Sequence, residues 1–270
     1  MFLNVNGRLV AADQPHFTFA ESHLSTTALI EEQLFFNGLE CRDYEAHYFS
    51  IMAAMRMFRR SIPMEYTPEF ILEEIQKTIK ENGDDSLSLV RFYSGTSSLG
   101  IPNYYISVNP MDKGHFKAKV VEEIDVFKDF YWHSDFLSGI RLNSLPLLDV
   151  ARAYCRDHHY ADCMLINERK ELVMTLKGYA FLRFGQAIKT PFESSGVYRG
   201  VFRSKVIDML KTLEEYTVEE SVLNPFDLQR ADELMIISQE GGLFSVNNYR
   251  KTSYKGQSLS QVEQGLMKLI

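Results

Sequence analysis

The sequence has few cysteines. Three of its 270 residues are cysteine, namely Cys41, Cys155 and Cys163, and no two of them have the Cys-x-x-Cys spacing. An odd and widely spaced set is not typical of a disulfide framework or of a zinc site. We therefore expect no structural metal and a cytoplasmic protein.

The sequence also lacks an excess of positive charge. Lys and Arg number 29 against 36 Asp and Glu, for a net charge of −7. A nucleic-acid-binding surface needs basic residues to neutralise phosphates, and an anionic membrane attracts the same residues. No apolar run approaches the roughly 20 residues of a membrane helix, and the start MFLNVNGRLV has no basic segment typical of a signal peptide. We expect neither a nucleic acid nor a membrane as a partner.

Several short catalytic motifs are missing as well. The patterns GxSxG, GxxxxGK[ST], HExxH and GxGxxG do not occur, which argues against several hydrolase and nucleotide-binding classes. The remaining composition, 45% hydrophobic and 24% charged, is that of a folded protein. A chain of this length can bury one large core or two smaller ones.

The first half of the chain predicts a small α+β domain, residues 1–120. Residues 2–10 alternate across Asn6-Gly7, which indicates a hairpin. A strand near 29–36 and a helix over 42–60 follow. Thr67 is a good N-cap for a second helix with Pro68 at its first position and Gly83 at its end. Strands are expected near 87–95, 103–110 and 116–126.

Residues 121–133 are interpreted as a linker, and residues 134–270 as a larger α+β domain. Its predicted elements begin with a helix over 147–158 and strands at 163–167, 171–176 and 179–184, with a hairpin turn at Asn167–Lys170. A helix is expected to begin after Gly200. Strands at 231–238 and 241–249 and a terminal amphipathic helix complete the prediction.

Five stretches occur in an order that resembles a known family: FFNGLECRDYEAHYFSIMAAMRMF, IRLNSLPLLDVARAYCRDHHYADCMLIN, ERKELVMTLKGYAFLRFGQAIKTP, SSGVYRGVFRSKVIDML and ADELMIISQEGGLFSVNNY. Together they resemble the class IV, or fold type IV, aminotransferases, which depend on pyridoxal phosphate (PLP) and include the branched-chain and D-amino-acid aminotransferases and aminodeoxychorismate lyase. The resemblance implies a two-domain D-amino-acid aminotransferase-like α+β fold, PLP as the cofactor, and a homodimer.

The residues at the family's cofactor positions do not match its pattern. The Schiff-base lysine lies three residues before an Asn, and here that position is Ile140. Arg141 beside it cannot replace the lysine, because a guanidinium stays protonated. The tyrosine after the Asn is Ser144, and the glutamate that supports the pyridine nitrogen corresponds to Met174. The phosphate-binding positions correspond to Ser50, Phe202 and Gln239.

These replacements predict a family member without PLP and without transaminase or lyase activity. A helix N-terminus attracts anions through its N–H groups, so the start of the helix after Gly200 is a candidate site for a small anionic ligand. The residues proposed for it are Gly200, Val201, Arg141, Arg199 and Arg203.

Two other interpretations stay open. Lys177 can take over the Schiff base in an active aminotransferase or lyase, if it faces the cofactor position. Side chains alternate along a strand, so either Met174 and Leu176 or Thr175 and Lys177 face inward, and the sequence does not decide which. A purely structural protein without a ligand is the third possibility.

Overall fold

The computed structural model describes residues 1–11, 29–83, 86–97, 100–112, 114–143 and 145–270. Ser144 lies outside these residues. The chain divides into two compact units. The first contains Met1–Lys113, Ile140–Ser144 and Ile270, and the second contains Gly114–Gly139 and Leu145–Leu269. Among the described residues, no helix is long and apolar enough to cross a membrane.

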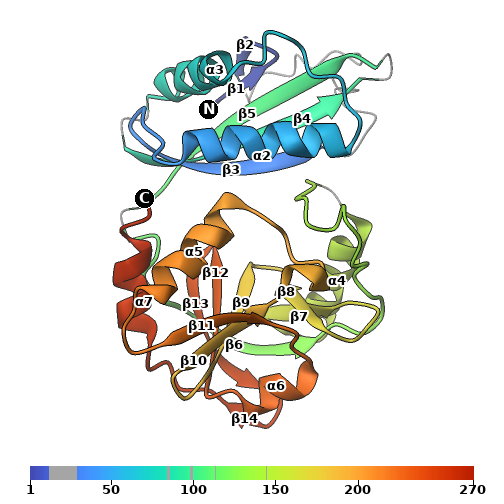
Figure 1. The fold of residues 1–270 in the computed structure, drawn as a ribbon, viewed down its shortest axis with the longest axis vertical. Coiled ribbons are helices and arrows are strands. Elements are labelled where there is room, and N and C mark those ends of the chain that lie inside the picture. The colour runs from blue at the N-terminus through green and yellow to red at the C-terminus, as the bar shows by residue number, and fades with distance from the viewer. Residues whose placement is uncertain (12–28, 84–85, 98–99, 113, 144) are drawn as a thin grey trace. The chain divides into compact units, whose positions relative to one another are not determined.

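The first unit contains a five-stranded antiparallel sheet in the order β2-β1-β5-β4-β3 (Figure 1). Strands β1 and β2 form the predicted hairpin, and Asn6 and Gly7 at its turn have φ of 49° and 85°. Positive φ at both positions is what an Asn-Gly turn supplies. The strands span Phe2–Val5 (β1), Arg8–Ala11 (β2), Ile30–Asn37 (β3), Leu87–Thr96 (β4) and Pro102–Pro110 (β5).

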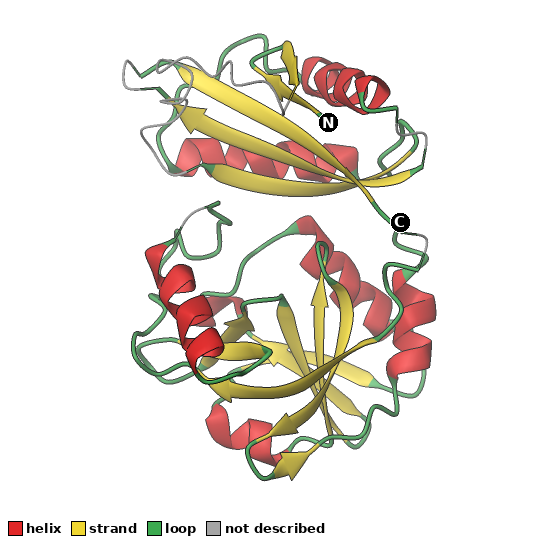
Figure 2. Ribbon diagram, turned by 180° about the vertical axis from the view of Figure 1, so that it is seen from behind, coloured by secondary structure: helices red, strands yellow, loops and turns green. Residues whose placement is uncertain are grey.

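Helices α2 (Tyr44–Met57) and α3 (Pro68–Glu81) pack on one face of this sheet. Figure 1 shows α2 in front of the strands, and from behind the strands lie in front of α2 (Figure 2). Alternate strand residues face the helices, which gives a core that includes Leu34, Phe36, Val90, Phe92, Ile106 and Val108.

The segment after Gly139 returns to the first unit. Leu142 forms an antiparallel bridge with Ile30 at the start of β3, and the Glu31 N–H donates to the Arg141 carbonyl at 2.9 Å. The side chains of Ile140 and Leu142 pack against the core of this unit. The apolar residues at 140 and 142 explain why the segment folds back.

The second unit is built on a nine-stranded sheet in the order β11-β10-β9-β12-β13-β6-β7-β8, with β14 paired to β13. The Leu172 N–H donates to the Leu223 carbonyl at 2.7 Å, so β8 at one end of the order meets the chain that follows β11 at the other. The strands span Lys119–Val126 (β6), Asp162–Ile166 (β7), Leu172–Thr175 (β8), Tyr179–Phe184 (β9), Ala187–Pro191 (β10), Thr217–Ser221 (β11), Glu233–Ser238 (β12), Gly242–Tyr249 (β13) and Thr252–Ser253 (β14).

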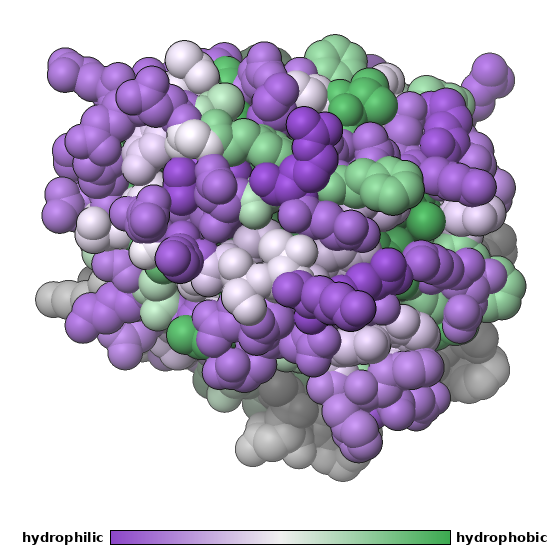
Figure 3. Space-filling model, turned by 90° about the horizontal axis from the view of Figure 1, so that it is seen from below, coloured by the Kyte–Doolittle hydropathy of each residue, from purple (hydrophilic) through white to green (hydrophobic). Residues whose placement is uncertain are grey.

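Four α-helices and a short 3-10 helix belong to the second unit. Helices α5 and α7 pack together, since a β-carbon on Gly265 would meet the Met209 sulfur at 2.2 Å. The face at the α6 and β14 end is mostly hydrophilic, with small hydrophobic areas between charged groups (Figure 3), which is ordinary for a protein surface. The helices span Pro146–Asp157 (α4), Glu193–Ser195 (η1), Val201–Lys211 (α5), Pro225–Arg230 (α6) and Leu259–Leu266 (α7).

The structure differs from the sequence-based expectations at the middle of the chain. Residues 121–126 of the predicted linker 121–133 belong to strand β6, which pairs in parallel with β13 and β7. Its residues Val121, Ile124 and Val126 are buried in the core of the second unit, so burial holds this segment in the sheet. Strands β10 and β11 and helix α6 were not predicted.

Candidate functional site at the start of helix α5

Helix α5 begins without a side-chain cap. Its N-cap, Gly200, has extended backbone angles (φ −150°, ψ 154°), and its first turn contains no acidic residue. The first N–H groups of a helix have no partner within the helix and carry partial positive charge. The backbone at Val201 is therefore suited to an anion, as the sequence predicts.

Tyr179 from strand β9 lies beside this helix start. A β-carbon on Gly200 would be 3.4 Å from the Tyr179 hydroxyl oxygen, and the tyrosine is 3% exposed. The Tyr179 O–H therefore lies next to the helix N-terminus, where it can donate a hydrogen bond to an anion. Family resemblance places Tyr179 at the position of an Asn of the cofactor site, but nothing in its local sequence relates it to Gly200.

The two arginines on either side of Gly200 have different surroundings. Arg199 is exposed and its guanidinium donates to the Phe136 carbonyl at 2.7 Å. Arg203 is 2% exposed, and its Nη2 donates to the Pro191 carbonyl at 2.7 Å and to Glu220 Oε2 at 2.9 Å. Because Arg203 is buried in an ion pair, only Arg199 is placed for a ligand from solvent.

Aromatic side chains fill the space behind the helix start. The rings of Phe202 and Phe116 stack with centroids 6.1 Å apart and planes 13° apart, and both are buried. His115 contacts Phe116 and its Nε2 lies 2.9 Å from the Gln239 carbonyl oxygen. Phe202 and Gln239, two of the predicted cofactor positions, are thus joined through residues 115–116. Phe202 cannot donate a hydrogen bond through its side chain.

The sequence predicts Lys177 on a strand. In the structure it lies in a bend between β8 and β9. The Asp162 carboxylate holds this bend, accepting from the N–H groups of Leu176 at 3.0 Å and Lys177 at 3.3 Å. The Lys177 side chain is exposed, and its Nζ lies 5.7 Å from the centroid of Phe244. Burial raises the pKa of Asp162 to about 6, although the Thr175 hydroxyl and nearby backbone N–H groups oppose that rise.

The pairing of β8 with β7 shows where Thr175 lies. Thr175 is the cross-strand partner of Met164, and opposed residues of an antiparallel pair point to the same face. Met164 belongs to the core of the second unit, so Thr175 points into that core. The register of the pair shifts between Met164 and Ile166, so simple alternation does not extend along β8. Met174 is 3% exposed. A buried methionine side chain supplies no charge to a ligand.

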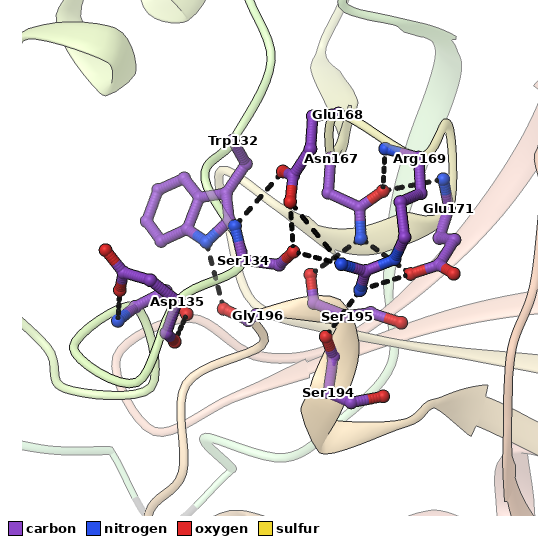
Figure 4. A network of polar contacts seen from close by, with 11 residues as sticks. Trp132, Ser134, Asp135, Asn167, Glu168, Arg169, Glu171, Ser194, Ser195 and Gly196 are labelled. Carbon is purple, nitrogen blue, oxygen red and sulfur yellow. Dashed lines mark hydrogen bonds and ion pairs between the residues drawn. The ribbon is translucent and has the colours of Figure 1, made fainter.

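A polar network holds the chain that leads into α5 (Figure 4). Arg169 donates to Ser134 Oγ at 2.7 Å, to Glu171 Oε2 at 2.8 Å and to the Ser194 carbonyl at 2.7 Å. The Trp132 indole N–H donates to the Gly196 carbonyl at 2.9 Å. The hydrogen bond from Arg169 lowers the pKa of Glu171. The network fixes residues 193–196 and, through them, the position of the helix start.

The remaining predicted positions lie in the first unit. Ser50 on α2 donates to Glu32 Oε2 at 3.0 Å, and His47 Nδ1 lies 2.6 Å from Glu32 Oε1. The serine at the phosphate-arginine position is therefore part of a hydrogen-bonded cluster with a carboxylate. Ile140 and Arg141 also belong to the first unit, whereas Met174, Lys177, Arg199, Gly200, Val201, Phe202, Arg203 and Gln239 belong to the second.

Comparison with known proteins identifies the family. The amino-transferase class IV model matches residues 29–249, and the chain therefore belongs to the class IV aminotransferase family. A search of the curated proteins finds no match.

Solved structures agree on the fold. The branched-chain aminotransferase of Escherichia coli is 14% identical with a TM-score of 0.85, covering 99% of this chain and 93% of that one. The branched-chain aminotransferase of Thermoproteus uzoniensis is 17% identical with a TM-score of 0.82, covering 100% and 95%. A hypothetical aminotransferase from Mycobacterium tuberculosis, solved with α-ketoglutarate and PMP, is 12% identical with a TM-score of 0.81, covering 99% and 98%. The predicted fold type IV architecture is confirmed.

Proposed function

We propose that this protein has kept the class IV aminotransferase fold but has lost PLP binding and the transaminase or lyase activity. The observation that carries the proposal is the buried stack of Phe202 on Phe116 at the α5 start. A PLP phosphate is a dianion that needs hydrogen-bond donors and positive charge. The Phe202 and Phe116 side chains supply neither, and the groups that remain at the α5 start can hold a small anion but include no amine for a Schiff base.

The other cofactor positions support the same proposal. PLP acts as an electron sink only when a lysine holds it and a carboxylate keeps its pyridine nitrogen protonated. Ile140 and Met174 stand at these positions by family resemblance, and both are apolar. Ser50 is hydrogen-bonded to Glu32, whose negative charge would repel a phosphate. The residues present do not fit PLP.

The direct experiment is equilibrium dialysis of the purified protein against PLP, with amino-group transfer measured from common donors. We expect no retained cofactor and no transfer. Stoichiometric retention of PLP would contradict the proposal, whether or not a donor amino acid is found.

We further propose that the α5 start binds a small anion. The donors are the first N–H groups of α5, with Val201 foremost, the Tyr179 hydroxyl and the Arg199 guanidinium. Arg203 is left out because Glu220 already pairs with it. Arg141 lies in the other unit and is not needed for this site.

Inorganic phosphate is a suitable probe for this anion site. Isothermal titration should detect its binding, and Tyr179→Phe and Arg199→Gln should each weaken it several-fold. Arg230→Gln, which removes an exposed arginine at the far end of α6, is the matched control and should bind as the wild type does. Equal affinity in all four proteins would exclude the α5 start as the site.

The second candidate function is an active PLP enzyme that uses Lys177. Its support is the bend held by Asp162, which places an ammonium group near a buried carboxylate. Lys119 is a matched control, since its Nζ lies 5.6 Å from the same Phe244 ring. If this alternative holds, Lys177→Ala abolishes transaminase activity and Lys119→Ala does not. A wild-type protein that is inactive with all common amino donors would exclude the alternative.

The homodimer and the cytoplasmic location also remain proposals. The first is supported by family resemblance and the second by the unpaired pattern of cysteines. Light scattering after gel filtration should give twice the mass of the 31.2 kDa chain, and a monomer would refute the first proposal.

A further inference from the structure

Two of the three cysteines lie together in the second unit. Cys155 is on helix α4 and Cys163 is on strand β7 beneath it. The Cys163 sulfur lies 3.9 Å from the Ala151 carbonyl oxygen, which is the acceptor one helical turn before Cys155. The Cys163 side chain therefore packs against the turn of α4 that runs from Ala151 to Cys155, and both cysteines are buried.

The two thiols differ in exposure and in charge environment. Cys155 is 7% exposed and Cys163 is completely buried. The neighbouring Cys163 thiol lowers the pKa of Cys155, and the Lys177 ammonium adds to that effect, whereas burial and Asp162 oppose it. The Cys155 thiol and burial raise the pKa of Cys163. A thiolate and not a thiol is the reactive nucleophile, so Cys155 is the member that reacts first.

We propose that Cys155 and Cys163 are an oxidisable thiol pair, which hydrogen peroxide converts into an internal disulfide. The Cys155 thiolate attacks one oxygen of the peroxide, the O–O bond breaks, and a sulfenic acid forms while hydroxide leaves and takes up the proton that Cys155 released, to become water. The Cys163 sulfur then attacks the Cys155 sulfur, and the hydroxyl leaves with the Cys163 proton as a second water. Two thiols lose two electrons, which reduce one peroxide to two waters.

This proposal gives Lys177 a role that does not depend on PLP. Its positive charge lowers the pKa of both Cys155 and Asp162. Asp162 directly precedes Cys163 and holds the bend that carries Lys177. Lys177 is therefore a positioning residue for the thiol pair, and the inference is independent of whether the family cofactor binds.

The test is peptide mapping after treatment of the folded protein with hydrogen peroxide. Trypsin cuts after Arg156, which separates the two cysteines into residues 153–156 and 157–169. We expect a disulfide-linked pair of these peptides that disappears on reduction. Cys41, in the first unit, should remain a free thiol because burial raises its pKa to about 12. Oxidation of Cys41 before the pair, or absence of the linked peptide once peroxide is consumed, would overturn the proposal.

Variants separate this chemistry from a purely structural role. Cys163→Ser should leave a sulfenic acid on Cys155 that dimedone traps, and Cys41→Ser should behave as the wild type. Lys177→Gln should shift the pH profile of Cys155 alkylation by iodoacetamide to higher pH, which a packing role would not do. If a cysteine variant fails to fold, the test is the pH profile of Cys155 alkylation in the wild type and in Lys177→Gln. Identical profiles in these two proteins would refute the role of Lys177.

Discussion

Helix α3 in the first unit and helix α5 in the second begin with different kinds of residue. Thr67 caps α3 by accepting a hydrogen bond from the Phe70 N–H, and Glu69 places a negative charge in its first turn. Gly200 caps α5 with no side chain, and its first turn has no acid. The positive end of α3 is thus met by its own residues, whereas that of α5 has neither a side-chain cap nor a first-turn acid.

The α3 start has the residues that stabilise a helix, whereas the α5 start lacks them, as the proposed anion site requires. A side-chain cap and a first-turn carboxylate each stabilise a helix, by about 1 kcal/mol and by 0.3–1 kcal/mol. At α5 both are absent, although the surroundings are well ordered by the Arg169 network. We infer that the ancestral phosphate site lost its cofactor partners but not its backbone.

Truncation of Phe202 should give the largest effect. Phe202→Ala removes a ring that is 4% exposed and stacked on Phe116, and such a change costs about 3 kcal/mol of unfolding free energy. Phe70→Ala at the α3 start is the control, and because Phe70 is only partly buried it should cost less. Urea denaturation measures both. A smaller loss for Phe202 than for Phe70 would mean that the α5 start is not packed as described.

Removal of the α3 cap should give an intermediate effect. Thr67→Ala leaves the Phe70 N–H without its acceptor and should lower the free energy of unfolding by about 1 kcal/mol. Thr67→Ser keeps a hydroxyl at the same position and should cost much less. If both substitutions have the same effect, the hydrogen bond is not the cause, and the contrast between the two helix starts loses its basis.

Addition of a cap to α5 should change stability least but ligand binding clearly. Gly200→Asp supplies the missing carboxylate, and because glycine is itself a fair N-cap the gain over it is only a few tenths of a kcal/mol, roughly. Its β-carbon would lie in ordinary contact with the Tyr179 hydroxyl, at 3.4 Å. The charge should repel phosphate and weaken its binding more than Gly200→Asn does. Unchanged affinity in Gly200→Asp would place the anion elsewhere.

The turns and helix starts that the sequence predicts correctly are those with a local signal in a few neighbouring residues. Asn6-Gly7 and Thr67-Pro68 each specify their turn or cap by the backbone angles and donors that they supply. Helix α6 had a signal of the same kind, since Asn224 and Asp227 form a capping box with Pro225 between them. It was missed because the helix is only six residues long and carries no clear apolar period.

The parts that could not be predicted depend on contacts between distant residues. Strand β6 belongs to the second unit because it pairs with β13, and no feature of residues 119–126 specifies that partner. The stack of Phe116 on Phe202 and the approach of Tyr179 to Gly200 likewise join segments far apart in the chain. Family resemblance located Phe202 and Gln239, but the residues that surround them became known only from the fold.

The loss of the cofactor is tested most directly by adding PLP to the purified protein, following the absorbance of an internal aldimine, and then reducing with borohydride before peptide mapping. Our account predicts no aldimine band and no lysine modified in a stoichiometric, site-specific way. A yellow protein in which borohydride fixes PLP to one lysine, Lys177 above all, would contradict it and establish the chain as a PLP enzyme with a relocated Schiff base.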